Sequence, residues 1–244
     1  MSFTPSDITD FYHHSRGRMT QRILRAIFRE WWHDITGYNV LGYGYTSPFL
    51  GAFTKDDPLS LSLLMNKRHH PRAWPAIDNN HVAVCDDRHM PIETQRMERI
   101  LVVHALETSE MPLHLLEEIW RSLEGNGRMI LVVPNRAGIW SRAEQTPFGQ
   151  GHPYSLTQLR SLLQTAGFSI ERYQRALYVP PGRSRILISL APLFEKIGRK
   201  LFPAFGGVLV VEASKQLFST HTVRTGGPAQ QKIPKAAPTA IKPG

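Results

Sequence analysis

The chain has 244 residues, of which 41% are hydrophobic, which suits one α/β domain with a sizeable core. No apolar run reaches the about 18 residues of a membrane-spanning helix, and the N-terminal segment lacks the apolar core of a signal peptide. Cys85 is the single cysteine, which excludes an internal disulfide and a thiolate metal cluster. We therefore expect a cytoplasmic location.

The formal net charge of +9 could serve an anionic partner such as RNA, or an acidic membrane surface. Part of this excess is terminal, because no acidic residue follows Glu212. Residues 219–244 are rich in Thr, Gly, Pro, Ala and Lys, and we expect them to form a disordered basic tail. That tail would account for part of the charge without a specific ligand.

Residues 1–16 are expected to form an N-terminal leader, and residues 17–218 the folded domain. In the leader, the cluster of Tyr12, His13, His14 and Arg16 would either cover a ligand or be solvated. An amphipathic helix over 17–33 should follow, with Trp31 and Trp32 packing it on a sheet.

Strands and helices are expected to alternate through the domain, which predicts a mostly parallel sheet with helices on both faces. Apolar periodicity predicts further helices at 112–123, 155–165 and 186–201, the last interrupted by Pro192. Short apolar runs predict strands at 40–41, 61–65, 81–85, 99–103, 129–133, 168–179 and 208–211.

The stretch Asn39 to Pro48, NVLGYGYTSP, joins a strand to a glycine turn. In a doubly wound domain such a junction meets a nucleotide-like ligand. We expect Ser47 to cap the next helix, with Pro48 at its first position. Farther along the chain, Gly125 and Gly127 should end the helix that starts at Pro112.

Four segments stand out, in the order NVLGYGYTSP, VCDDRHMPI (84–92), RILVVHALE (99–107) and LLEEIWRSLEGNGRMILVVPN (115–135). Together they resemble class I S-adenosylmethionine-dependent methyltransferases. The segment GIWSRAEQTPFGQGHPYSLTQL (138–159) is also similar to a little-characterised group of bacterial methyltransferase-domain proteins. The resemblance implies a Rossmann-like methyltransferase fold with strand order 3-2-1-4-5-7-6, in which strand 7 is antiparallel.

The resemblance further implies S-adenosylmethionine as the cofactor. Glycines permit close backbone approach to the methionine end, and an acidic residue can accept from the adenine amine. Aromatic side chains would stabilise the sulfonium cation, a role open to Tyr43, Tyr45 and His104. The expected cofactor-binding residues are Gly42, Tyr43, Gly44, Asp86, Asp87 and His104.

Methyl transfer needs a general base only if the acceptor must lose a proton. His104 and Glu107 are the expected catalytic residues; alternatively, His104 is a hydrogen-bonded strand-end residue and Glu107 a solvated loop acid. The loop over 135–154 lies where acceptors enter in this fold, and it could instead be an ordered packing loop. Its expected substrate-binding residues are Asn135, Arg136, Trp140, His152 and Tyr154.

The first motif departs from the family pattern, since Gly42 stands where an acidic residue is usual and Thr46 and Pro48 replace glycines. The segment 64–70 has no acid for the ribose hydroxyls. The alternative to an enzyme is therefore a non-catalytic binding or regulatory protein with this fold, which could be RNA-associated. The histidines lack metal-ligand spacing, so no metal site is expected.

Overall fold

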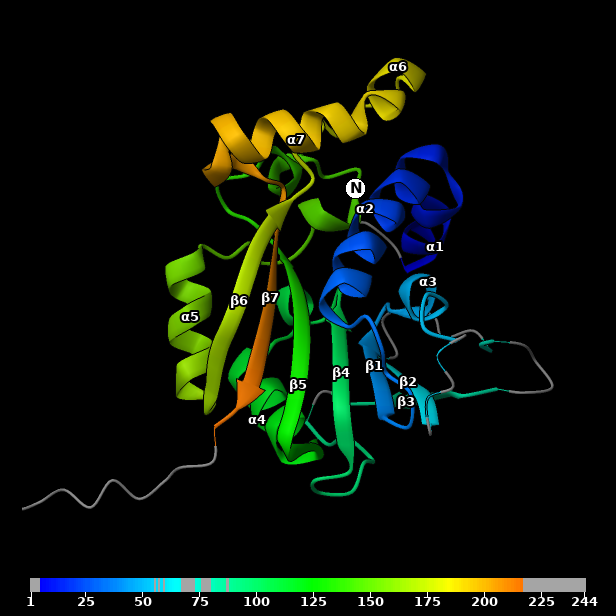
Figure 1. Ribbon diagram of the computed structural model, residues 1–244, viewed down its shortest axis with the longest axis vertical. Helices are drawn as coiled ribbons and strands as arrows, with labels where there is room; N and C mark the ends of the chain where they lie inside the picture. The colour runs from blue at the N-terminus through cyan, green and yellow to red at the C-terminus, as the bar shows by residue number, and fades with distance from the viewer. Residues whose placement is uncertain are drawn as a thin grey trace, which may run out of the picture.

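The computed structural model describes residues 5–54, 56, 58, 60–66, 73–75, 80–86 and 88–216. Its centre is a seven-stranded sheet in the order β3-β2-β1-β4-β5-β7-β6 (Figure 1). The strands are β1 (Asn39–Gly44), β2 (Ser60–Asn66), β3 (Val82–Cys85), β4 (Met97–Val103), β5 (Leu123–Pro134), β6 (Phe168–Ala176) and β7 (Val208–Lys215). Strands β1 to β5 are parallel, whereas β7 is antiparallel to both β5 and β6. The predicted α/β class, strand order and antiparallel strand are confirmed.

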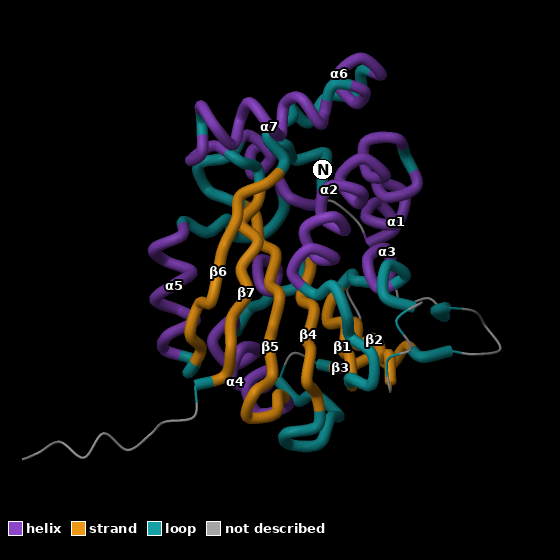
Figure 2. Tube along the Cα trace, viewed as in Figure 1, coloured by secondary structure: helices purple, strands orange, loops and turns teal. Residues whose placement is uncertain are grey.

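Helices cover both faces of this sheet (Figure 2). The first face carries α1 (Pro5–His13), α2 (Ser15–Trp31) and α3 (Ser47–Leu50), and the second carries α4 (Pro112–Ser122) and α5 (Leu156–Thr165). Successive strand residues point to opposite faces, so in β1 Val40 joins the first core cluster and Leu41 and Tyr43 join the second. Two further helices, α6 (Arg185–Ser189) and α7 (Ala191–Leu201), follow β6 in the sequence and precede β7, and they lie end to end beyond one end of the sheet (Figure 1).

The first helices are part of the packed structure. Phe11, Tyr12 and Arg16 are buried, whereas His13 and His14 are exposed. The turn between α1 and α2 is tight, because a Cβ at Gly17 would lie 2.0 Å from the Phe11 carbonyl oxygen. The expected boundary between residues 16 and 17 therefore falls inside α2. Of the cluster in the expected leader, only His13 and His14 are exposed to solvent.

Three details of the expected elements are wrong. Gly42 lies within β1 rather than in the turn, paired with Leu63 and Leu101. The N-cap of α3 is Thr46, not Ser47, and it makes no side-chain capping bond. No glycine caps α4, because buried Leu123 is already extended and pairs with Met97, which places Gly125 and Gly127 inside β5.

Other local expectations are confirmed. Ser155 accepts a hydrogen bond from the Gln158 N–H, and the Gln158 side chain accepts one from the Ser155 N–H, which forms a capping box at α5. Trp31 and Trp32 are both buried. Within the described ranges, no helix is long and apolar enough to cross a membrane.

Candidate functional site

A cavity of about 480 Å³ lies at the carboxyl ends of β1 and β2, which we call the strand-end cavity. Its volume falls in the range of about 300–1,000 Å³ that is usual for small-molecule sites. Residues of α1, α2, the β1–α3 turn, the start of α3, the end of β2 and the segment 73–75 line it: Thr9, Tyr12, His13, Arg18, Gln21, Tyr45, Ser47, Pro48, Met65, Ala73 and Trp74.

The lining suits a ligand with a cation and a carboxylate. Tyr12 and Tyr45 are stacked with ring centroids 5.6 Å apart, and Trp74 adds a third aromatic ring. Such rings stabilise an organic cation. Arg18 is exposed and could pair with a carboxylate, while none of the described lining residues is acidic.

The two glycines of the first motif serve internal packing. Gly44 has a φ of +83°, and a Cβ there would lie 2.4 Å from the Val103 carbonyl oxygen of β4. At Gly42 a Cβ would lie 2.1 Å from Thr46 Oγ1. Tyr43 is buried in the core cluster on the second face of the sheet. Of the motif, the structure brings Tyr45, Ser47 and Pro48 to the strand-end cavity.

A buried hydrogen-bonded chain adjoins the cavity. Tyr12 Oη lies 2.7 Å from His104 Nε2, and His104 Nδ1 lies 3.2 Å from Glu107 Oε1. In the tautomer that donates from Nδ1 to the Glu107 carboxylate, Nε2 is the acceptor of the Tyr12 hydroxyl proton. His104, with a φ of 55°, turns away from β4 to make these contacts. His104 is therefore hydrogen-bonded through both ring nitrogens, and Glu107 is buried rather than solvated.

This chain links the cavity to a buried carboxylate. Burial raises the pKa of the Tyr12 phenol well above its usual value of 10.0, and the charges of Tyr45 and Glu107 raise it further. Burial, and then Glu107, raise the pKa of Tyr154 to about 12. Tyr12 therefore meets a ligand as a protonated phenol, and its proton can pass to His104 only if a proton is taken up from the cavity side.

The structure describes only one of the two acidic residues, Asp86 and Asp87, that were expected near the adenine. Asp86 is exposed at the end of β3, and its carboxylate accepts a hydrogen bond from the Arg88 N–H at 3.0 Å. Asp87 and residues 67–70 lie outside the described residues. The described residues include no group of three or more His, Cys, Asp or Glu side chains that could hold a metal ion.

The loop over 135–154 is ordered and mostly packed. Asn135 donates to the carbonyl oxygens of Ala204 and Gly206, at 2.9 and 2.6 Å. Trp140 is fully buried and donates to the Val179 carbonyl oxygen. Tyr154 is also buried. The packing-loop alternative therefore describes these three residues.

Of the five expected substrate-binding residues in that loop, Arg136 and His152 are exposed. Arg136 Nη2 lies 3.2 Å from His152 Nε2. The backbone N–H of His152 donates to the Glu107 carbonyl oxygen at 2.7 Å, which fixes the loop against the buried chain.

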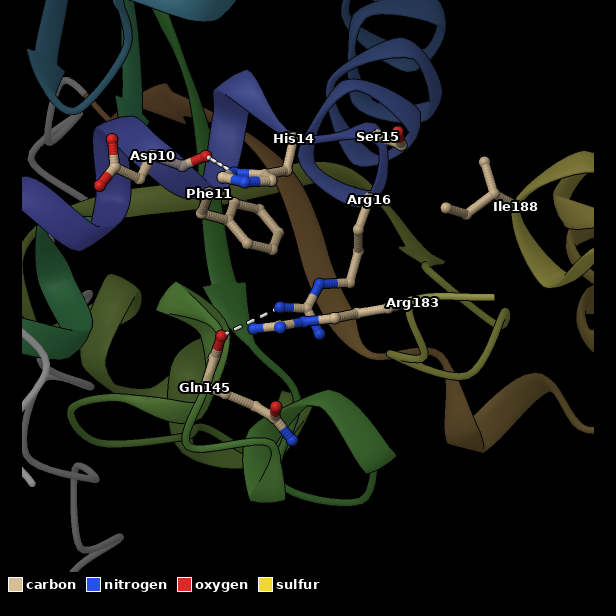
Figure 3. Close-up of a pocket in the computed structure, with 8 residues that line it drawn as sticks. All are labelled: Asp10, Phe11, His14, Ser15, Arg16, Gln145, Arg183 and Ile188. Carbon is tan, nitrogen blue, oxygen red and sulfur yellow. Dashed lines mark hydrogen bonds between the residues drawn. The ribbon is translucent and has the colours of Figure 1, made fainter. Parts of the chain in front are cut away.

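A second cavity, of about 400 Å³, lies on the other side of α1. We call it the arginine cavity, because Arg16 and Arg183 both line it and their guanidinium groups lie close together in Figure 3. Arg16 donates to the carbonyl oxygens of Pro181 and Gln145, at 2.7 and 3.1 Å. Burial, and then the charge of Arg183, lower the pKa of Arg16. Among the described residues, no carboxylate forms an ion pair with either arginine.

Comparison with known proteins identifies the fold of this chain. No protein-family model and no curated protein matches the sequence. The structure is similar to an S-adenosylmethionine-dependent methyltransferase from Aquifex aeolicus, with a TM-score of 0.59 and 15% identity over 88% of this chain and 100% of that chain. A second from Mesorhizobium loti has a TM-score of 0.56 and 12% identity over 78% of this chain and 96% of that chain. The chain has the fold of class I methyltransferases.

The same fold also occurs in a protein named for another activity. A [4+2]-cyclase is similar with a TM-score of 0.54 and 15% identity, over 81% of each chain. The fold alone therefore does not fix the reaction, which depends on the residues at the site.

Sequence reasoning missed most of the cavity walls. Arg18, Gln21 and Trp74 were not expected at the site, nor was Arg183. The available signal for these walls was the cluster of aromatic and basic residues that contains Tyr12 and Arg16. This cluster lies well before the first strand in the sequence.

Proposed function

We propose that the chain is a cytoplasmic S-adenosylmethionine-dependent methyltransferase. The observation that carries the proposal is the strand-end cavity at the carboxyl ends of β1 and β2, in a sheet of the methyltransferase order. The aromatic rings of Tyr12, Tyr45 and Trp74 would surround the sulfonium, and Arg18 would pair with the methionine carboxylate. Asp86 remains the proposed acceptor for the adenine amine.

S-adenosylmethionine would supply the electrophilic methyl group. The residues of this chain would hold it, exclude water and position the acceptor, which is where much of the rate of such a displacement arises. For an acceptor that loses a proton, His104 and Glu107 would act as the base through Tyr12. The Tyr12 hydroxyl takes that proton as its own passes to His104 Nε2.

The arginine cavity would hold a separate anionic ligand, because α1 lies between it and the strand-end cavity. Two guanidinium groups with no described carboxylate partner favour a carboxylate or phosphate between them. Arg136 and His152 remain proposed contacts at the rim of the same end of the sheet.

Titration of the full chain with S-adenosylmethionine and S-adenosylhomocysteine by calorimetry tests the proposal. We expect saturable binding that Arg18→Gln weakens by about tenfold, the scale of one charge-assisted hydrogen bond. Arg22→Gln is the matched control, because Arg22 is exposed on the same helix and is absent from the cavity lining. Ser47→Tyr, which fills the cavity, should abolish binding. No binding at millimolar ligand would reject the enzyme proposal.

A second candidate is a non-catalytic protein of this fold, which could be RNA-associated. The observation that favours it is the lack of any described acid in the cavity lining, together with the hydrogen-bonded state of both nitrogens of His104. Failure of both ligands to bind, with salt-sensitive retention of single-stranded RNA, would support it.

A further inference from the structure

The helices α6 and α7 expose a continuous apolar stripe. Its members recur at intervals of four, three, four and four residues, which places them on one side of a helical rod. Their exposed fractions range from 41% to 69%, and the stripe consists of Ile186, Leu190, Leu193, Ile197 and Leu201. Phe202 and Phe205, 57% and 56% exposed, extend it beyond the end of α7.

This stripe is not the face that holds the helices on the domain. The inward face carries buried Ala191 and Gly198, and a Cβ at Gly198 would lie 2.4 Å from the Tyr178 ring. Buried Glu195 accepts from the Tyr178 N–H at 2.7 Å. The rod, which lies along the top of the molecule in Figure 1, is therefore anchored by one face, while the apolar stripe on another face is exposed.

Basic residues flank the stripe. Arg183, Arg185, Lys196, Arg199 and Lys200 are exposed. At 100° per residue, Arg185, Lys196 and Lys200 fall on the side of the stripe away from the inward face. The only acidic residue between positions 183 and 205 is Glu195, whose carboxylate is buried. The outward surface of the rod thus combines apolar side chains with positive charge alone.

We propose that α6 and α7 lie on an anionic lipid bilayer, with the stripe inserted among the acyl chains and the flanking cations at the headgroups. The positive charge beside the stripe favours an anionic bilayer over a second copy of the chain as the partner of this surface. A second copy of the chain would bring the same cations against these, whereas an anionic bilayer neutralises them and buries the stripe. The rod would be an interfacial helix pair that holds the rest of the domain at the bilayer surface. This surface does not depend on the proposed methyl transfer.

Flotation of the full chain with vesicles tests the proposal. We expect binding to vesicles of phosphatidylcholine with about 30% phosphatidylglycerol, and at least about tenfold less to phosphatidylcholine alone. Ile186→Ser with Leu193→Ser and Leu201→Ser should abolish binding. Lys196→Gln with Lys200→Gln should weaken it about 25-fold, since each cation near the surface contributes about fivefold.

The matched control is Met111→Ser with Tyr173→Ser, because these side chains are 46% and 43% exposed outside the rod. It should bind as the parent chain does, and all variants should keep the parent's melting temperature. Failure of the parent chain to float with anionic vesicles would overturn the proposal, as would equal binding by the stripe variant. Dimerisation that the stripe variant removes, without vesicle binding, would assign the surface to a second copy. Retention of RNA in place of vesicles would assign it to a nucleic acid.

Discussion

At the scale of single residues, Gly42 shows how a motif position can be required for packing. Its missing side chain leaves room for Thr46 Oγ1, and Leu50 Cδ1 would lie 2.6 Å from an added Cβ. We expect Gly42→Ala to lower the free energy of unfolding by about 1–3 kcal/mol, as overpacked cores do. Urea unfolding measures this. Gly51→Ala is the control, because its Cβ would meet only the flexible end of Arg25 at 3.2 Å.

Thr46 offers a way to separate packing from backbone effects at Gly42. Among the described residues, its buried hydroxyl oxygen has no hydrogen-bond partner. Adding Thr46→Ala to Gly42→Ala removes the hydroxyl oxygen that the new methyl group would strike, so the double variant should recover part of the loss. Strictly additive effects of the two substitutions would show that the close contact is not the cause.

Residue roles were only partly predictable from the sequence. The expected positions of Asp86 and His104 at strand ends follow from local pattern, and the structure places both there. The partner of His104 is Tyr12, 92 positions earlier, and no local pattern reports such a contact. Tyr43 was expected near the cofactor, but the alternation of strand residues directs its ring into the core.

At the scale of elements, periodicity predicted the sheet and most helices, because each buries one face. Periodicity could not show that the apolar stripe of α7 is exposed, because the sequence does not say which face of the helix the domain covers. Glu195 marks the covered face, where burial raises the pKa of its carboxyl above 4.5 despite backbone hydrogen bonds.

The raised pKa of Glu195 gives a pH dependence with a definite sign. Between the unfolded and folded pKa values the native state binds more protons, so stability falls as pH rises through the folded pKa. We expect Glu195→Gln, which keeps the acceptor for the Tyr178 N–H, to raise the melting temperature at about pH 8 more than at about pH 4. Glu93→Gln, at an exposed position, is the control and should show no such difference. An equal shift at both pH values would show that ionised Glu195 does not destabilise the fold.

At the scale of the whole molecule, the sheet brings distant segments to one edge, and α1 is the segment that separates the two cavities there. Thr9, Tyr12 and His13 line the strand-end cavity, while Asp10, Phe11 and His14 line the arginine cavity. Sequence reasoning treated residues 1–16 as a leader because their partners lie far along the chain. The methyltransferase fold therefore depends on its first helix for both proposed ligand sites.

Deletion of residues 1–16 tests this dependence. The deletion removes the buried rings of Phe11 and Tyr12, and burial of each such side chain contributes about 1.5–3 kcal/mol. We expect the free energy of unfolding in urea to fall by about 3–6 kcal/mol, together with loss of S-adenosylmethionine binding. Deletion of 219–244, the predicted disordered tail, is the control and should change neither quantity. If the shortened chain unfolds at the same urea concentration as the full chain, residues 1–16 are a leader and the walls of both cavities must be reassigned.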